Sequence, residues 1–389
     1  MIKDFKTILA KKDIKYLYLL FFGMLIAAVI EMVGLSSIPL FIMVIIDINV
    51  LINKFPDFFV ISYIKDLKQS QLTIFGGIAL IGIFLVKNLY LAIYFYFQGK
   101  VIRDIRSDIT NELFNKYLKA PYKYHIQNNP AYLIRSITSN VGGSINTILS
   151  TLSVTKEALV LVVIFILLFL NEPLVSISVF FTLSILSGTF LFFTRKELIL
   201  RGLKAENEKE QQLRTINHSL GSIKETKILN REKYLSGIFN QQVKEIEKHS
   251  LFLYFLNQVP KLFLEFIAVF SVSIIAILFV VINLSNEKIL PVISLLAVCS
   301  IRLIPAFNLI LSSLSTRRFS LASLQIVADA FKNTPIEERF KNNHFLNEEI
   351  TKKDFFKTNI IFKNVFFAHE NSKSKILKNI SLEINCGQK

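Results

Sequence analysis

Five charged side chains lie inside long apolar stretches of the sequence, where ionised groups are rare. Lys87, Lys261 and Arg302 are basic, and Glu31 and Glu265 are acidic. A charged group at the depth of a lipid bilayer is costly, so it usually faces a cavity or a partner. Three cations on three different stretches predict a cavity that attracts an anion, with the two carboxylates orienting those cations.

Pairing among these same charges is the alternative interpretation. Lys261 and Glu265 are four residues apart, which places them on one face of a helix. Glu31 would then pair with Lys87 or Arg302. In that case the charges would hold the helices together and would not contact a substrate.

The stretches that hold these charges are long enough to cross a membrane. The chain is 52% hydrophobic and 19% charged, whereas a soluble domain has about 25% charged residues. The sequence therefore predicts an all-α membrane domain with six spans, and Lys156 and Glu157 are expected at the cytoplasmic end of the third. Each stretch meets the length of roughly 20 apolar residues that a helical span needs: 16–46, 72–98, 145–170, 174–194, 251–283 and 289–315.

Basic residues between the spans indicate their orientation, because cytoplasmic connections are enriched in Lys and Arg. Residues 1–15 hold five Lys and two Asp, and residues 98–150 hold seven basic and three acidic residues. Residues 195–250 hold twelve and eight, but residues 47–70 hold three of each. Both termini and the two long connections are therefore expected in the cytoplasm. The net charge of +16 fits this face, and the sequence contains no recognisable nucleic-acid-binding module.

The long cytoplasmic connections carry apolar residues at helical spacing. This spacing predicts that the second span continues as one helix from about 72 to 119, roughly 70 Å long. Polar bends near 122–130 and 217–228 divide each connection into two long helices and could dock onto a cytoplasmic partner. The apolar residues of the first connection are Ile102, Ile105, Ile109, Leu113 and Tyr117.

A second domain is predicted to begin at residue 359. Apolar residues alternate with other residues around Val365 and again from Ile380 to Ile384, which is typical of β-strands. We therefore divide the chain into a membrane domain (1–330), a linker (331–358) and the start of a second domain (359–389). Two strands cannot bury a stable core alone, so this domain is expected to continue beyond Lys389. The two Cys residues form no metal-binding pattern, and neither a disulfide nor a metal site is expected.

The last thirty residues, IIFKNVFFAHENSKSKILKNISLEINCGQK, resemble the start of an ABC nucleotide-binding domain. The six spans with long cytoplasmic helices resemble the type I ABC exporter fold. This resemblance implies a half-transporter that works as a homodimer in the bacterial inner membrane, surrounded by membrane lipids. It also implies that ATP and Mg²⁺ are bound mainly by residues after Lys389. No catalytic residue is therefore expected within 1–389, and this stretch alone is not expected to hydrolyse ATP. His369 matches the aromatic position that stacks on adenine, although it could also be a surface-loop histidine.

Shorter segments resemble bacterial flippases of lipid-linked oligosaccharides: VIEMVGLSSIPLF, FLVKNLY, VPKLFLE and IRLIP. In those proteins basic residues at the positions of Lys87, Lys261 and Arg302 line a cavity that receives the pyrophosphate of the lipid carrier. The resemblance implies an anionic, amphipathic lipid as cargo, bound more loosely here because Lys lacks the bidentate geometry of Arg. Other cargoes are a peptide, a drug-like amphiphile or a lipopolysaccharide precursor. Other classes are an ion-gradient-driven carrier, with Glu31 and Glu265 as proton sites, and a membrane scaffold or receptor.

Overall fold

The computed structural model describes residues 2–46, 69–171, 173–281, 286–337, 359–367 and 375–385. The chain forms two compact units, Met1–Pro335 and Ile336–Lys389. The first unit is helical and the second contains a small sheet. The two units are described separately.

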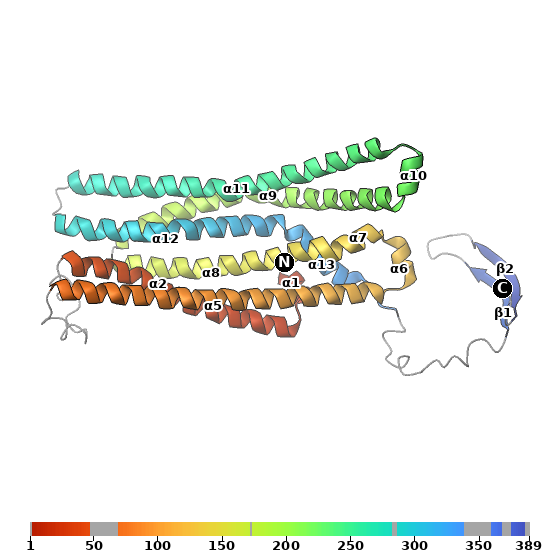
Figure 1. Cartoon of the computed structure of the whole chain (residues 1–389), viewed down its shortest axis with the longest axis horizontal. Helices are drawn as coiled ribbons and strands as arrows, with labels where there is room; N and C mark the ends of the chain where they lie inside the picture. Colours follow the sequence, from red (N-terminus) through yellow and green to blue (C-terminus); the bar gives the residue numbers. More distant parts are fainter. Residues whose placement is uncertain are drawn as a thin grey trace. The chain divides into compact units, whose positions relative to one another are not determined.

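Long helices form the first unit, and they lie side by side along one axis (Figure 1). Two short helices, α6 (Tyr122–Gln127) and α10 (Ile223–Ile228), turn the chain at the same end of this bundle. A third short helix, α7 (Pro130–Arg135), leads through a π-helical turn, η1 (Ser136–Asn140), into α8. The remaining helices are α1 (Ile2–Ile8), α2 (Lys11–Ile46), α5 (Gln69–Leu118), α8 (Val141–Asn171), α9 (Pro173–Gly221), α11 (Glu232–Val281), α12 (Asn286–Phe319) and α13 (Leu321–Asn333).

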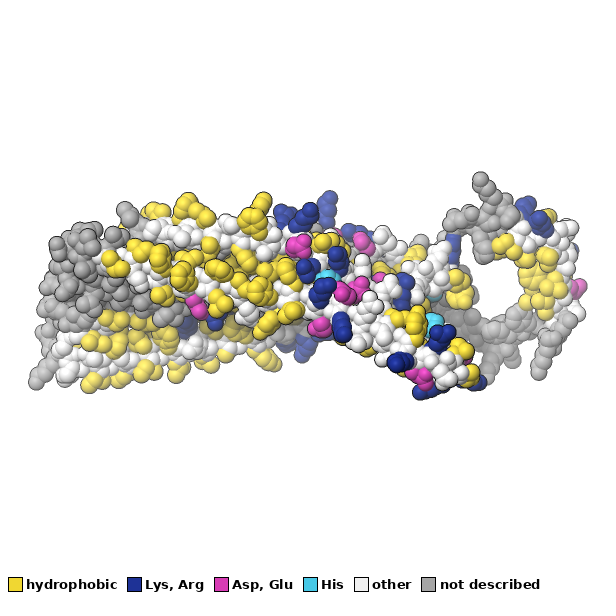
Figure 2. Space-filling model, turned by 90° about the horizontal axis from the view of Figure 1, so that it is seen from above, with side chains coloured by type: hydrophobic (Ala, Val, Ile, Leu, Met, Phe, Trp, Pro, Cys, Tyr) yellow, Lys and Arg dark blue, Asp and Glu magenta, His cyan; other side chains and the backbone are white. Residues whose placement is uncertain are grey.

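Four helical stretches among the described residues are long and apolar enough to cross a membrane. The predicted fifth and sixth spans coincide with α11 and α12, which contain 50 and 34 residues; the full number of six spans stays a prediction. Figure 2 shows that hydrophobic side chains cover the part of the first unit away from α6 and α10, whereas charged side chains gather nearer to them. The four stretches are Lys11–Ile42, Gln69–Leu118, Pro130–Leu170 and Ser176–Gly221.

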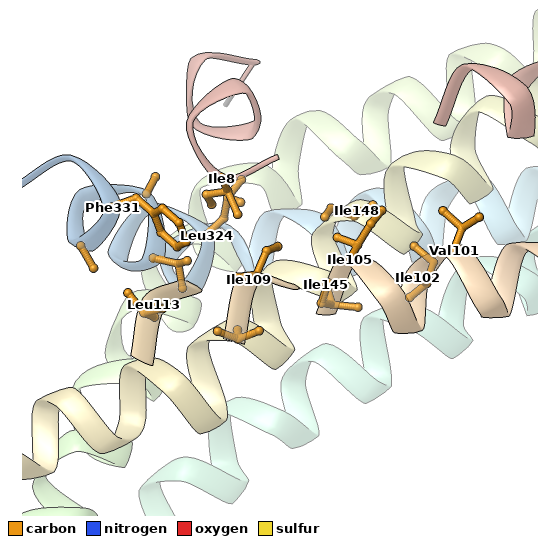
Figure 3. Packing of buried hydrophobic residues seen from close by; sticks show 14 of the residues in the cluster. Ile8, Val101, Ile102, Ile105, Ile109, Leu113, Ile145, Ile148, Leu324 and Phe331 are labelled. Carbon is orange, nitrogen blue, oxygen red and sulfur yellow. The ribbon is translucent and has the colours of Figure 1, made fainter. Parts of the chain in front are cut away.

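Helix α5 continues without a break from the apolar span into the charged part of the bundle. Its 50 residues correspond to roughly 75 Å at 1.5 Å per residue, which confirms the single long helix predicted from about 72 to 119. All five apolar residues predicted to share a face, from Ile102 to Tyr117, are buried. They pack against Ile145 and Ile148 of α8 and against Leu324 of α13 (Figure 3).

A second apolar cluster lies among α2, α8, α9, α11 and α12. It includes Leu161 and Ile164 of α8, Leu264 of α11 and Leu303 of α12. Apolar contacts therefore join helices that are far apart in the sequence. This packing fixes how the charged side chains of the spans face one another.

Hydroxyl groups in α8 are accommodated within the helix itself. The Oγ1 atoms of Thr147, Thr151 and Thr155 each donate to the carbonyl four residues earlier, at 3.1, 2.8 and 3.0 Å. A hydroxyl that bonds its own backbone needs no water, so it can lie at membrane depth. These bonds satisfy the hydroxyls of three Thr residues within α8.

Two antiparallel strands make up the described part of the second unit, β1 (Ile360–Phe367) and β2 (Leu377–Ile384). Ile360 faces Ile384, and the register shifts on either side of Val365. Asn364 and Asn379 have φ values of 48° and 55°, a left-handed conformation that Asn tolerates better than most residues. The strands predicted from residue alternation are confirmed. Most of their side chains are exposed.

Candidate functional site

Three of the five predicted charges meet between helices of the first unit. Arg302 of α12 contacts Glu31 of α2 twice: Nε lies 2.6 Å from Oε1, and Nη2 donates to Oε2 at 3.0 Å. Lys87 of α5 reaches the same carboxylate, with Nζ 3.7 Å from Oε1. The alternative prediction was that Glu31 pairs with Lys87 or Arg302. In the structure Glu31 pairs with both.

Two further charges come from α8. Arg302 Nη2 donates to Glu157 Oε2 at 3.2 Å, and Lys156 Nζ lies 2.9 Å from the other oxygen of that carboxylate. The expectation that Lys156 and Glu157 lie at the cytoplasmic end of the third span stays a prediction, and the structure adds that Glu157 contacts Arg302 of α12. Glu157 is not among the charges that the sequence predicts to meet, although residue 157 lies within the apolar stretch 145–170.

The resulting charge network consists of Glu31, Lys87, Lys156, Glu157 and Arg302. Three cations and two carboxylates give it a net charge of +1. The Glu157 side chain is 1% exposed and the Glu31 side chain 9%. Removing such groups from water carries a penalty of several kcal/mol per ion, which only close partners offset. The network therefore holds its carboxylates well compensated and keeps one positive charge in excess.

The Lys87 side chain is guided by its neighbours on two helices. A Cβ atom at Gly34 would lie 3.2 Å from Lys87 Cδ, so a larger residue at position 34 would press against the lysine. The ammonium lies 5.1 Å from the ring centroid of Phe84, one turn earlier in α5, within the range of a cation–π contact. Lys156 makes the same contact with Phe95 at 5.1 Å.

Hydrogen bonding in the network is incomplete. Arg302 Nε and Glu157 Oε1 are within ion-pair distance of a partner, but neither makes an aligned hydrogen bond. Arg302 is also 21% exposed at its side chain and Lys156 20%. Both atoms nevertheless face an oppositely charged partner, at 2.6 Å for Arg302 Nε and 2.9 Å for Glu157 Oε1.

The other two predicted charges lie elsewhere. Lys261 and Glu265 pair with each other on α11, with Nζ 3.8 Å from Oε1, and their side chains are 54% and 48% exposed. Within this chain they are not part of the charge network. His369 lies outside the described residues. Among the described residues, no group of three or more His, Cys, Asp or Glu could hold a metal ion.

The turns at α6 and α10 form a second candidate site, because they expose apolar side chains. In α6, Tyr122 is 78% exposed and Ile126 is 70% exposed; in α10, Ile228 is 68% exposed. Close to these turns, α7 and α9 are joined by contacts of a buried arginine. Arg135 of α7 is only 2% exposed, donates to the carbonyl of Glu206 and lies 3.1 Å from the Glu210 carboxylate of α9.

These features define a multi-pass membrane protein whose spans continue into long polar helices and enclose a charge network. Residues 20–304 match the family described as the ABC transporter transmembrane region. This match covers well over half of the 389 residues, and the chain belongs to this family. Membership implies that the intact transporter is an ATPase and points to ATP-driven export.

Proposed function

We propose that the intact transporter uses ATP to flip or export an anionic amphipathic lipid, with a lipid-linked saccharide as the favoured cargo. The charge network at mid-span carries this proposal. Its excess positive charge lies where a bilayer otherwise excludes ions. A cargo with a phosphate or pyrophosphate group would be attracted there while its apolar chain stays among apolar side chains.

Lys87 is the cation best placed to exchange partners. Its Nζ lies 3.7 Å from the Glu31 carboxylate, which is longer than a charge-assisted hydrogen bond of about 2.8 Å. Lys87 would therefore lose only a weak contact when a phosphate oxygen replaces that carboxylate. Arg302 is held by carboxylates from two helices. In this proposal it therefore orients the site and supplies positive charge, and Lys87 makes the contact with the cargo.

Lys261 and Glu265 belong to the proposed cavity through the second half-transporter. Their exposed side chains leave them available to face a homodimer axis, where they would add a cation opposite Lys87. In this proposal Glu265 orients Lys261 in the way that Glu31 orients Lys87.

Coupling to ATP is proposed to run through α6 and α10. Their exposed apolar side chains would dock on nucleotide-binding domains that bind ATP and Mg²⁺, with His369 against the adenine. The buried contact between Arg135 of α7 and Glu210 of α9 would make the helices next to α6 and α10 move together. The proposed location is the bacterial inner membrane, with both termini in the cytoplasm.

Lipid-stimulated ATPase activity and flipping by the reconstituted transporter test the cargo. Lys87→Gln is expected to reduce stimulation by a pyrophosphate lipid about tenfold, the effect of losing roughly 1.4 kcal/mol of binding. Lys248→Gln is the matched control, because Lys248 is exposed in the cytoplasmic part of α11. Unchanged flipping in both Lys87→Gln and Arg302→Gln would reject the anionic cargo. A response to a peptide or neutral amphiphile alone would favour the other cargoes.

A further inference from the structure

An apolar pocket of about 430 Å³ lies where α1 meets α2 and α8. Its volume falls within the usual range of ligand pockets, about 300–1,000 Å³. Thr151 and Thr155 also border it, but their hydroxyls already donate to the α8 backbone, so they offer no unused donor. The wall consists mainly of side chains such as Phe5, Leu9, Leu17, Phe21, Ile148 and Leu152.

The pocket lies along the first turns of a membrane span. Its α2 residues run from Ile14 to Met24, and those from Leu17 onward lie within the apolar stretch that begins at residue 16. Seven residues of helix rise about 10 Å, which fits within one leaflet of a hydrocarbon core about 30 Å thick. This part of the pocket is therefore at a depth that suits acyl chains, and the part near Ile14 and α1 is at a depth that suits headgroups.

Helix α1 forms a fixed border of this pocket. Ile8 is buried and packs in the same cluster as Leu324 and Phe331 of α13 (Figure 3). Asp4 lies 3.6 Å from Lys332 of the same helix. Because α1 is anchored on α13, the pocket persists as a cavity next to it.

Positive charge is concentrated at the mouth of the pocket. Lys6 belongs to its lining, and Lys11 precedes Ile14 by three residues, which places it on the same helix face. Among the described residues, neither lysine has an acidic side chain within ion-pair distance. Lys12, in contrast, turns to α5 and lies 2.6 Å from Asp108.

We propose that this pocket binds an acyl chain of an anionic phospholipid, whose headgroup phosphate lies between Lys6 and Lys11. An apolar wall at leaflet depth fits the chain, and the two lysines at its mouth fit the phosphate. The site shares no residue with the charge network. It therefore holds whether or not the cargo is a lipid-linked saccharide.

Residues 1–389 contain no Trp, so a Trp introduced into the pocket adds a new signal, which is read as the difference from the unsubstituted protein. Phe21 lines the pocket, whereas its neighbour Phe22 does not and is 62% exposed. We would place Phe21→Trp and Phe22→Trp separately in the full chain, reconstituted in phosphatidylcholine vesicles. Fluorescence quenching is then compared between equal minor fractions of brominated phosphatidylglycerol and brominated phosphatidylcholine.

The expected result is selective quenching at position 21. Brominated phosphatidylglycerol should quench Phe21→Trp about twofold or more above brominated phosphatidylcholine, because two lysines concentrate the anionic lipid there. Phe22→Trp should respond equally to both lipids. Adding Lys6→Gln and Lys11→Gln should remove the selectivity, and adding Lys12→Gln should leave it unchanged.

Equal quenching of Phe21→Trp by both lipids would overturn the proposal, as would selectivity that survives the Lys6→Gln, Lys11→Gln double substitution. Absence of quenching at position 21 alone would also overturn it, because the pocket would then be closed to lipid. If Phe21→Trp does not assemble, native mass spectrometry of the unmodified transporter replaces it. Anionic lipid should then be retained over phosphatidylcholine, and Lys6→Gln with Lys11→Gln should abolish that retention.

Discussion

Two groups of charges in the spans differ in how many helices they join. The charge network connects α2, α5, α8 and α12 through Arg302 and two carboxylates. Lys261 and Glu265 connect α11 only to itself. Both groups contain Lys and Glu within apolar sequence, so residue type alone does not separate them. The difference is that one group fixes the relative positions of helices and the other leaves its charges available.

Burial adds to this difference. The carboxylates of the network are almost fully buried, whereas Lys261 and Glu265 are about half exposed. Breaking a buried ion pair by removing one partner costs about 3–5 kcal/mol, because the remaining charge is uncompensated. An exposed pair contributes about 0–1 kcal/mol. Substituting one carboxylate in each group therefore tests the comparison directly.

The largest effect is expected for Glu31→Gln. This change removes the carboxylate shared by Arg302 and Lys87 and should lower the free energy of unfolding by about 3–5 kcal/mol. Thermal unfolding of the purified transporter in detergent measures it.

Glu265→Gln is the matched control for this experiment, since it removes a carboxylate from the pair on α11. It should lower stability by no more than about 1 kcal/mol. Equal losses in the two variants would contradict the distinction between the network and the pair.

The sequence predicted most of this fold because helix spacing survives outside the membrane. In the part of α5 beyond its apolar stretch, one face is packed and the other is exposed and polar, so the residues from Ile102 to Tyr117 stand out. Within the spans this contrast fades, because lipid is as apolar as a packed neighbour. The sequence therefore located Glu31, Lys87 and Arg302 and offered their pairing as one alternative, but it did not decide between that pairing and an open cavity.

The same limit explains why the contact of Glu157 with Arg302, and the separation of Lys261 from Arg302, are not predicted. Whether Lys261 faces Arg302 depends on the rotation of α11 relative to α12, which the composition of an apolar stretch does not determine. Glu157 lies within the apolar stretch 145–170, and its position along α8 brings it to Arg302. The signal for this contact is the position of Glu157 along the helix, not its residue type.

A smaller effect is expected from substituting two adjacent glycines of α8. They allow a position that contacts another helix to be compared with one that does not, without any change of charge. A Cβ at Gly143 would overlap Ser323 of α13, with the Ser323 Cβ atom only 2.5 Å away; a Cβ at Gly142 meets nothing within 4 Å. Gly143→Ala should destabilise the protein by about 1–3 kcal/mol through overpacking. Gly142→Ala should stabilise it by up to about 1 kcal/mol, because Ala favours helix.

Thermal unfolding of both Gly variants provides the measurement, and each serves as the control for the other. A loss of stability in Gly142→Ala as large as that in Gly143→Ala would show that helix α8, and not its contact with α13, determines the outcome.

The smallest effect concerns the charged part of α11, before its apolar stretch, where a buried His249 is surrounded mainly by basic groups. Burial lowers the pKa of His249 below its usual 6.5, and Arg201 lowers it further. As pH falls below about 6.5, the unfolded chain takes up a proton before the folded chain does, so stability should decrease with acidification. The other nearby charges are Lys204 and Lys248, which also lower the pKa, and Glu245, which raises it.

His249→Gln removes this titration and should flatten the dependence of the unfolding temperature on pH below 6.5. The chain contains five His, so the difference between the two proteins isolates the contribution of His249. An identical slope in both would show that burial in this part of α11 has no effect on protonation. A steeper loss of stability in His249→Gln would mean that protonated His249 is stabilised by Glu245 more than it is opposed by the lysines and Arg201, which would reverse the sign of its electrostatic surroundings.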